Sequence, residues 1–250
     1  MLKVPNVRWP GGCFADQYHW RDGIGKPEER RSRINNHWGG TPEPNTFGTH
    51  EYFDFLDMIG SEAFISANVG SGTIQEAADW LEYLTATGTS LAEERTRNGH
   101  PEPYHVLFWG IGNESWGCGG PFTTQEYISE LKRHATFTNN YNPNVQTQFV
   151  SVGPDSYDEF SFGYTEAIMD KYDPDTEVSI LVSEWGSWLA PAEGTDPGFL
   201  IQQNSQRDAV NTFENPGNVA PKAIQVNTTG NNMSVTVQPQ SVTVLTIDAR

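Results

Sequence analysis

The chain has 250 residues, of which 36% are hydrophobic and 12% aromatic, enough to bury the core of one large domain or two small ones rather than remain disordered. Thirty-two acidic residues against fifteen basic ones give a net charge of −17. That surface repels phosphate backbones and anionic lipid, so nucleic-acid and membrane partners are not expected. No export signal follows the first methionine, so we expect a cytoplasmic protein, with an extracellular one left open by the abrupt N-terminus.

The first predicted element is a strand over residues 4–9, which ends in a Pro-Gly-Gly turn. A polar loop rich in Gly and Arg follows to about residue 46. Apolar residues at helical spacing then predict a helix over 49–59 that stops at Gly60, with a buried face of Tyr52, Phe53, Leu56 and Ile59. Residues 63–69 form the next predicted strand.

Two capping boxes predict two further helices. The box that starts at Thr73 opens a helix that buries Ile74, Ala77, Ala78, Leu81 and Leu84. The box that starts at Thr123 opens one that buries Tyr127, Leu131 and Ala135. Strands are predicted over 106–111 and 146–152, and each follows one of these helices or the loop behind it.

The remaining chain is predicted to hold a helix over 164–172 and a strand over 178–182, which leads into Ser-Glu-Trp-Gly at 183–186. The sequence pattern then changes. Short strands in which apolar and polar residues alternate are predicted at 223–226, 233–237 and 241–247, separated by Asn, Gly and Pro turns. Such alternation is typical of antiparallel sheets and indicates a segment of a β-sandwich.

Alternating strands and amphipathic helices predict parallel strands joined by crossovers. The unusual residues follow the strands, as they do at the mouth of an α/β barrel. A doubly wound sheet also binds ligands at strand ends, but no Gly-x-Gly-x-x-Gly loop follows any strand here. We therefore predict an incomplete (β/α)8 TIM-type barrel over residues 1–212, followed by a partial C-terminal β-sandwich over 213–250.

Two glutamates stand directly after apolar strands: Glu114 and Glu184. A carboxylate in such a place is costly to bury without partners. One such residue is as easily a salt-bridged or exposed structural group as a catalytic one. Two at equivalent positions, one preceded by Asn113 and one followed by Trp185, favour a catalytic pair.

Glycoside hydrolysis requires such a pair. One carboxylic acid protonates the leaving oxygen while a carboxylate attacks the anomeric carbon, and in a retaining enzyme the two groups lie about 5–5.5 Å apart. Asn113, beside the first glutamate, suits a hydrogen bond to the sugar 2-hydroxyl that strengthens in the transition state.

Longer runs carry a closer resemblance. Gly-Asn-Glu at one strand end and Glu-Trp-Gly at a later one are similar to the barrel glycosidases with the acid on strand four and the nucleophile on strand seven. Five runs, including Trp-Pro-Gly-Gly-Cys and Trp-Gly-Cys-Gly-Gly, narrow the resemblance to the α-L-arabinofuranosidases of glycoside hydrolase family 51; they lie at 8–16, 18–25, 68–72, 110–120 and 196–204. The match covers roughly residues 4–209.

The resemblance implies release of terminal, non-reducing α-L-arabinofuranosyl groups from arabinose-containing polysaccharides and oligosaccharides, with retention. It assigns Glu114 as the acid/base and Glu184 as the nucleophile, with Asn68 and Asn113 holding the arabinofuranose. Members of the family are often hexameric, so a homo-oligomer is expected. No metal or cofactor is expected, since the six histidines lack metal-ligand spacing.

Other residues allow two interpretations each. Arg8 either fixes a catalytic carboxylate or braces the Trp-Pro turn. Trp116 and Trp185, with Trp20, are either sugar platforms or packing at the barrel mouth. Cys13 and Cys118 are the only cysteines; they could form one bridge, although a chain of this size does not require it and two cysteines slightly favour a reducing compartment.

The strand count departs from the family pattern. A βαβ unit takes roughly 30 residues or more, yet three unit steps would have to fit between Glu114 and Glu184. Comparison with the family places the missing segments near 156–164 and 209–215, and the first strand before Met1. Two alternatives therefore stand beside the hydrolase: an inactive fragment that at most binds sugar weakly, and another barrel glycosidase of the endoglucanase or xylanase type.

Overall fold

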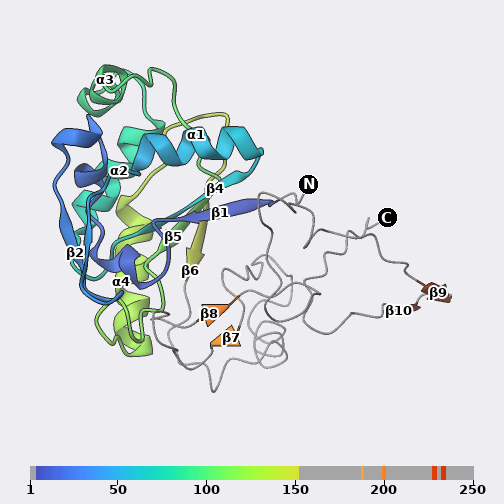
Figure 1. Ribbon diagram of the computed structural model, residues 1–250. Helices are drawn as coiled ribbons and strands as arrows, with labels where there is room; N and C mark the ends of the chain where they lie inside the picture. The colour runs from blue at the N-terminus through green and yellow to red at the C-terminus, as the bar shows by residue number, and fades with distance from the viewer. Residues whose placement is uncertain (1–3, 152–186, 189–198, 201–226, 230–231, 235–250) are drawn as a thin grey trace, which may run out of the picture. The chain divides into compact units, whose positions relative to one another are not determined.

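The computed structural model describes residues 4–151 continuously and, beyond them, 187–188, 199–200, 227–229 and 232–234 (Figure 1). By its internal contacts the chain divides into two units, one of Lys3–Ser183 and one of Glu184–Arg250 with Met1–Leu2. The division proposed from the sequence, at 212/213, stays a prediction.

Four parallel strands form the sheet of the first unit, and their order in the sheet follows their order in the chain (Figure 1). No strand is inserted out of sequence among them. The predicted strands at 4–9, 63–69, 106–111 and 146–152 are confirmed with shorter bounds, as β1 (Asn6–Trp9), β4 (Glu62–Ala67), β5 (Phe108–Ile111) and β6 (Gln148–Ser151).

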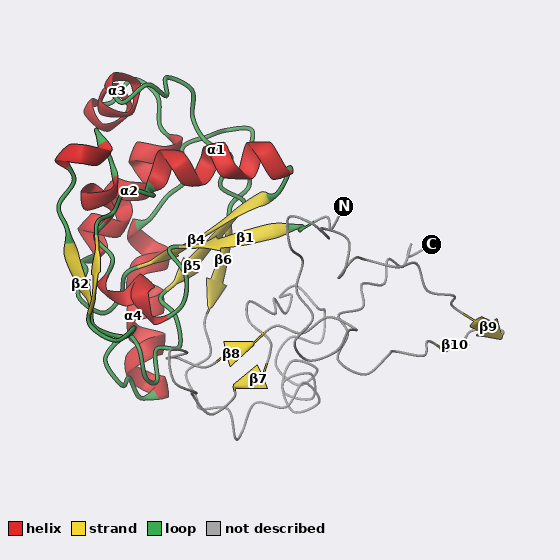
Figure 2. Cartoon of the chain, viewed as in Figure 1, coloured by secondary structure: helices red, strands yellow, loops and turns green. Residues whose placement is uncertain are grey.

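Helices fill the crossovers between these strands. Figure 2 shows them gathered along one side of the sheet. The described helices are α1 (Thr49–Ile59) between β1 and β4, α2 (Ile74–Thr85) and α3 (Ser90–Arg97) between β4 and β5, and α4 (Thr124–Phe137) between β5 and β6. The β1–α1 connection also carries three 3-10 turns, η1 (Cys13–Gln17), η2 (Trp20–Gly23) and η3 (Pro27–Glu29), and the antiparallel pair β2 (Arg33–Asn35) and β3 (Thr41–Glu43).

The core lies between the sheet and the helices. Alternate strand residues supply its sheet side, because successive side chains of a strand point to opposite faces. These are Ala63, Ile65, Ala67, Trp109 and Ile111, which pack with apolar residues of α1 and α2. Arg8 has the opposite parity and pairs in register with Phe64, which pairs with Phe108. Arg8 therefore lies on the face of the sheet turned away from the helices.

The helix ends follow the predicted signals closely. Gly60 ends α1 with φ 68°, a left-handed conformation that glycine adopts without steric cost. The box at Thr123 is complete, since the Thr123 side chain accepts from the Glu126 N–H and the Glu126 carboxylate accepts from the Thr123 N–H. The box at Thr73 is only half formed, because the Glu76 carboxylate pairs with His19 instead, at 2.9 Å.

Some predicted core positions were wrong. Ile59 is 40% exposed because it is the last residue of α1, where the helix leaves the sheet. Ala135 of α4 is exposed, and His134 is buried in its place. In α2 the buried face also takes in Trp80 and Tyr83, a wider stripe than the aliphatic pattern indicated.

The helix α3 was not predicted. Its sequence, Ser-Leu-Ala-Glu-Glu-Arg-Thr-Arg, has no apolar stripe. Its anchor is the buried Arg95, whose guanidinium donates to four backbone carbonyls, those of Tyr83, Ala86, His100 and Pro101. The charge is thus satisfied by peptide oxygens rather than by a carboxylate.

The second unit is described only at two antiparallel pairs, β7 (Ser187–Trp188) with β8 (Phe199–Leu200) and β9 (Asn227–Thr229) with β10 (Asn232–Ser234). Of the strands predicted there, β10 overlaps the start of 233–237. The predictions at 164–172, 178–182, 223–226 and 241–247 lie outside the described residues. Among the helices that are described, none has the length and apolar content needed to cross a membrane.

Candidate active site

The predicted site residues of the first unit collect where β1, β4 and β5 end. The strands are parallel and adjacent, so the loops that follow them share one edge of the sheet. Asn68 directly follows β4, and Asn113 and Glu114 follow β5. Arg8 reaches this edge from β1. Ligands of parallel α/β folds bind at this edge.

Arg8 and Asn113 are in direct contact. Nη1 of Arg8 donates a hydrogen bond to Oδ1 of Asn113, across 105 residues of sequence. Asn113 is 2% exposed, so its side chain is enclosed by Arg8 and by the residues of its own loop. This contact orients the amide NH2 of Asn113 away from Arg8 and toward Cys118, whose Sγ lies 3.7 Å from Nδ2.

Glu114 occupies an uncommon backbone conformation. Its φ is 40°, which a residue with a side chain keeps only where its surroundings hold it. Its carbonyl oxygen accepts hydrogen bonds from the N–H groups of Gly117 and Cys118, both at 2.8 Å, so a tight turn follows it directly. The residue as a whole is half-buried. The loop therefore presents Glu114 at a fixed point of the strand edge.

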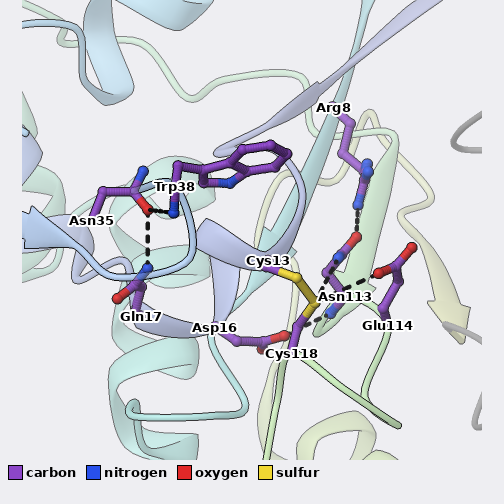
Figure 3. Close-up of a disulfide and its surroundings, with 9 residues drawn as sticks. All are labelled: Arg8, Cys13, Asp16, Gln17, Asn35, Trp38, Asn113, Glu114 and Cys118. Carbon is purple, nitrogen blue, oxygen red and sulfur yellow. Dashed lines mark hydrogen bonds between the residues drawn. A yellow bond between two sulfur atoms is a disulfide. The ribbon is translucent and has the colours of Figure 1, made fainter. Parts of the chain in front are cut away.

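A disulfide joins Cys13, in the turn after β1, to Cys118, in the loop after β5 (Figure 3). Of the two states left open by the sequence, the structure has the bridge. Sγ of Cys118 lies 3.6 Å from Oε2 of Glu114 and 3.7 Å from Nδ2 of Asn113. The link is thus in van der Waals contact with both candidate residues of this loop.

Asp16 was missed by the sequence analysis, and its carboxylate links two of the loops at this edge. Its Oδ1 accepts from the Val69 N–H at 3.0 Å and its Oδ2 from the Asn113 N–H at 3.1 Å; Figure 3 shows the carboxylate directed at the Asn113 backbone. Asp16 is 3% exposed, and burial raises its pKa to about 6, against the lowering effect of these N–H groups and of Arg8.

Asn68 is engaged within its own loop. Its Oδ1 accepts from the N–H groups of Gly70, Ser71 and Gly72, and its Nδ2 donates to the Tyr18 carbonyl and to the Ser71 hydroxyl, all within 2.9–3.1 Å. The side chain is 7% exposed. Asn68 therefore shapes the loop after β4, beside the place where Asn113 and Glu114 emerge.

The aromatic candidates separate. Trp20 is 1% exposed, stacks on Trp80 with ring centroids 6.4 Å apart and donates from Nε1 to the Glu76 carbonyl, so it is a core residue rather than a sugar platform. Trp116 is half-buried in the turn after Glu114. Glu184 and Trp185 lie outside the described residues.

One group of donors within the described residues has metal-like spacing: Cys13, Glu114 and Cys118 offer ligand atoms within 4.8 Å of one another. Both sulfurs are bonded to each other. Metals bind thiolates, which a disulfide does not supply, so the carboxylate is the one metal-binding group of this set.

Comparison with known proteins decides the family. A family profile described as the alpha-L-arabinofuranosidase 1 domain matches residues 1–177. The chain belongs to the α-L-arabinofuranosidases of glycoside hydrolase family 51. The motif that holds Glu114 and all four strands of the parallel sheet fall inside the matched region.

Curated relatives agree with the family assignment. The chain is 38% identical to an "Intracellular exo-alpha-L-arabinofuranosidase" of Bacteroides ovatus, over 83% of this chain and 51% of the relative. It is 37% identical to "Alpha-L-arabinofuranosidase C" of Emericella nidulans, over 66% of this chain and 33% of the relative. The chain thus spans about half of the first relative's length and a third of the second's.

Solved structures agree as well. The family 51 arabinofuranosidase of Xanthomonas axonopodis pv. citri superposes with a TM-score of 0.73 at 39% identity, over 82% of this chain and 52% of that one. An arabinose complex of the Thermotoga maritima α-L-arabinofuranosidase gives a TM-score of 0.57 at 44% identity, over 60% of this chain and 31% of that one.

Proposed function

We propose that this protein is a retaining glycosidase that removes terminal, non-reducing α-L-arabinofuranosyl groups from arabinose-containing polysaccharides and oligosaccharides. One observation carries the proposal: Glu114 stands at the carboxyl end of β5, held in an uncommon conformation next to Asn113 and Arg8. The family assignment supports it, since the curated relatives bear arabinofuranosidase names.

In this mechanism Glu184 attacks the anomeric carbon and forms an arabinosyl-enzyme while Glu114 protonates the leaving oxygen. Water then releases the sugar, and Glu114 takes the proton of that water. Both carboxyl groups must face one furanose ring, about 5–5.5 Å apart. Glu114 is half-buried beside the disulfide, with Oε2 3.6 Å from Sγ of Cys118.

Neighbouring residues would hold the sugar. Arg8 orients Asn113, whose amide NH2 group, beside Sγ of Cys118, would donate to the 2-hydroxyl. Asn68 would act by shaping its loop. It would also contact the sugar if a sugar hydroxyl replaced one of its present hydrogen-bond partners. Trp116 and Trp185 are proposed as apolar surfaces for the sugar or the group that leaves.

The architecture proposed for this chemistry is a (β/α)8 barrel over 1–212 with a sandwich segment over 213–250. Four parallel strands in chain order, with helices along one side, support a barrel over a doubly wound sheet, which reverses its strand order at the binding crevice. The homo-oligomer and the cytoplasmic location stay predictions; one relative is named intracellular.

The proposal is tested with an aryl α-L-arabinofuranoside. The protein is expected to release the aryl group, Glu184→Gln to abolish release and Glu114→Gln to lower it by about 10²-fold or more. Glu102→Gln, on an exposed residue, is the matched control. A folded protein that releases nothing, or release that survives Glu184→Gln, would overturn the assignment.

A second candidate is an inactive fragment. The alignment with the Bacteroides ovatus relative runs over 261 residues but takes in 83% of this chain of 250, so that relative carries internal residues without a counterpart here. This supports the loss of internal segments, which we propose lie near 156–164 and 209–215. L-Arabinose binding seen by NMR, without turnover of any arabinoside, would favour this candidate.

A further inference from the structure

We infer that Asp16 is a positioning residue for the reaction: its carboxylate locks the loop after β4 to the loop after β5 and thereby fixes the direction of Glu114. The inference rests on the proposed function for its effect on catalysis. Its structural part, the coupling of two loops through one carboxylate, stands on the contacts alone.

Each carboxylate oxygen of Asp16 serves a different loop. Oδ1 accepts from Val69, one residue after Asn68, and Oδ2 accepts from Asn113, one residue before Glu114. The backbone carbonyl of Asp16 also accepts from the N–H of Ser71 at 2.9 Å and from its hydroxyl at 3.2 Å. Three strand-end loops thus meet at one buried residue.

The glycines around Asp16 show that this junction is closely packed. A Cβ on Gly70 would lie 2.5 Å from the Asp16 carbonyl oxygen, and a Cβ on Gly112 would lie 2.6 Å from Cγ2 of Val69. Side chains there would push the loops apart. The two glycines therefore permit the backbones to approach the carboxylate from both sides.

The hydrogen bond to Asn113 acts on Glu114 through the chain. It fixes the peptide plane between Gly112 and Asn113, one residue before Glu114, while the turn bonds from Gly117 and Cys118 fix the plane that leaves Glu114. The φ of 40° lies between these two constraints. When the first constraint is removed, Glu114 can relax toward a commoner conformation, which turns its carboxyl group away from the leaving oxygen.

The ionised state of Asp16 is the one that holds both loops. A carboxylate offers acceptors on both oxygens, and hydrogen bonds to a charged acceptor are stronger than neutral ones. Arg8 is the charged side chain that acts on it, and its positive charge favours this state. Asparagine keeps the shape but has one oxygen, so its NH2 group would face one of the two N–H donors.

The experiment compares Asp16→Asn with Asp57→Asn, a control on the exposed face of α1. The substrates are an aryl arabinofuranoside with a good leaving group and an alkyl arabinofuranoside with a poor one. A misdirected acid should lower kcat/KM, which reports the acid-assisted step, by about 10²-fold on the alkyl substrate, as small misplacements do. On the aryl substrate, which needs little protonation, the loss should be roughly ten times smaller.

An equal loss on both substrates, or no loss, overturns the catalytic part of the inference. Loss of folded protein alone would not produce a dependence on the leaving group. The conservative Asp16→Glu, which restores a second oxygen, should recover part of the alkyl activity.

A second measurement does not depend on turnover. In 15N-labelled protein the amide signals of Val69 and Asn113 are expected to shift together, with one shared midpoint, as Asp16 takes up its proton, and both to move in Asp16→Asn. Separate midpoints, or movement of one amide only, overturn the coupling. A wild-type protein with coupled amides and no turnover would contradict the proposed function and leave the coupling standing.

Discussion

The helix side of the sheet and its carboxyl edge are held together by different means. On the helix side, Trp20, Trp80 and Trp109 are 1%, 2% and 0% exposed, and Trp80 meets Trp109 edge to face at 5.7 Å. At the carboxyl edge the links are single polar or covalent bonds: Asp16 to two amides, Arg8 to Asn113 and the disulfide.

The difference shows how the first unit can be stable as a whole and still hold single side chains in fixed positions. Apolar burial is additive over many contacts and tolerates small shifts, so it fixes the fold without fixing any one atom. Hydrogen bonds depend on distance and angle, so they place a group such as Glu114. Substitutions on the helix side should therefore mainly lower the free energy of unfolding. Substitutions at the carboxyl edge should mainly lower activity, with a smaller effect on the free energy of unfolding.

The largest stability loss is expected on the helix side. Trp109→Ala should lower the free energy of unfolding by about 3–5 kcal/mol, because it removes a fully buried aromatic residue and leaves a cavity. Chemical denaturation of the purified protein measures the loss. Phe149→Ala, at a residue 40% exposed, is the control and should cost less than half as much. Equal losses would break the distinction between the two regions.

The disulfide should give the next largest effect. It closes a loop across 105 residues, and a link of that span contributes about 4 kcal/mol by restricting the unfolded chain. Denaturation with and without a thiol reductant measures the difference. The Cys13→Ser, Cys118→Ser double variant should match the reduced protein and ignore the reductant; if the reductant leaves the wild type unchanged as well, the bridge does not contribute.

The pH dependence of stability should carry a contribution from Asp16. Its pKa rises from 3.8 to about 6 on folding, so the folded state holds the proton more tightly than the unfolded state. The stabilisation that protonated Asp16 gives the folded state is therefore complete below pH 3.8 and is lost as pH rises through about 6. The loss in the free energy of unfolding totals about 3 kcal/mol. Stability curves of wild type and Asp16→Asn should differ in slope between pH 3.8 and about 6 and run parallel on either side of that window; parallel curves throughout would contradict the shift.

His50, a buried group on the helix side, should change stability with pH in the opposite direction to Asp16. Burial, with the stacked His100, lowers the pKa of His50 to about 4, and its ring nitrogens bond the hydroxyls of Tyr83 and Tyr104, both at 2.7 Å. Its stabilising contribution is thus lost as pH falls from its ordinary value through about 4. The two groups limit stability from opposite ends of the acid range.

The smallest expected effect is at a helix end. Thr123→Ala removes the side-chain acceptor and half of the capping box of α4, and should cost about 1 kcal/mol. Thr136→Ala in the same helix, where the hydroxyl bonds only the Lys132 carbonyl on the exposed face, is the matched control and should be close to neutral. Denaturant midpoints compare the two, and an equal cost would mean that the cap contributes nothing beyond helix propensity.

Local signals in the sequence predicted much of the fold. The apolar runs gave β1, β4, β5 and β6, and the stop at Gly60 and the box at Thr123 gave helix ends within a residue. The helix α3 was missed because its anchor, Arg95, bonds carbonyls of other segments, which leaves no periodic pattern. The half-formed box at Thr73 failed for a similar reason, since Glu76 found a partner in His19, 57 residues away.

The candidate site was only partly visible in the sequence. Glu114 and Asn113 stand out because a polar pair follows an apolar strand. Asp16 and the disulfide do not, because their partners lie 53 to 105 residues away and depend on which strands are neighbours. The one available signal was that Cys13 and Asp16 share the unusual run after β1.

The central claim is that Glu184 becomes arabinosylated while Glu114 acts as the acid. The most direct measurement is mass spectrometry of Glu114→Ala after exposure to an arabinofuranoside with a strongly activated leaving group, whose departure needs no acid. With no base left to activate water, one arabinosyl group should accumulate on the protein, and peptide mapping should place it on Glu184. An adduct on another residue, or a folded variant that gains none, would contradict the account.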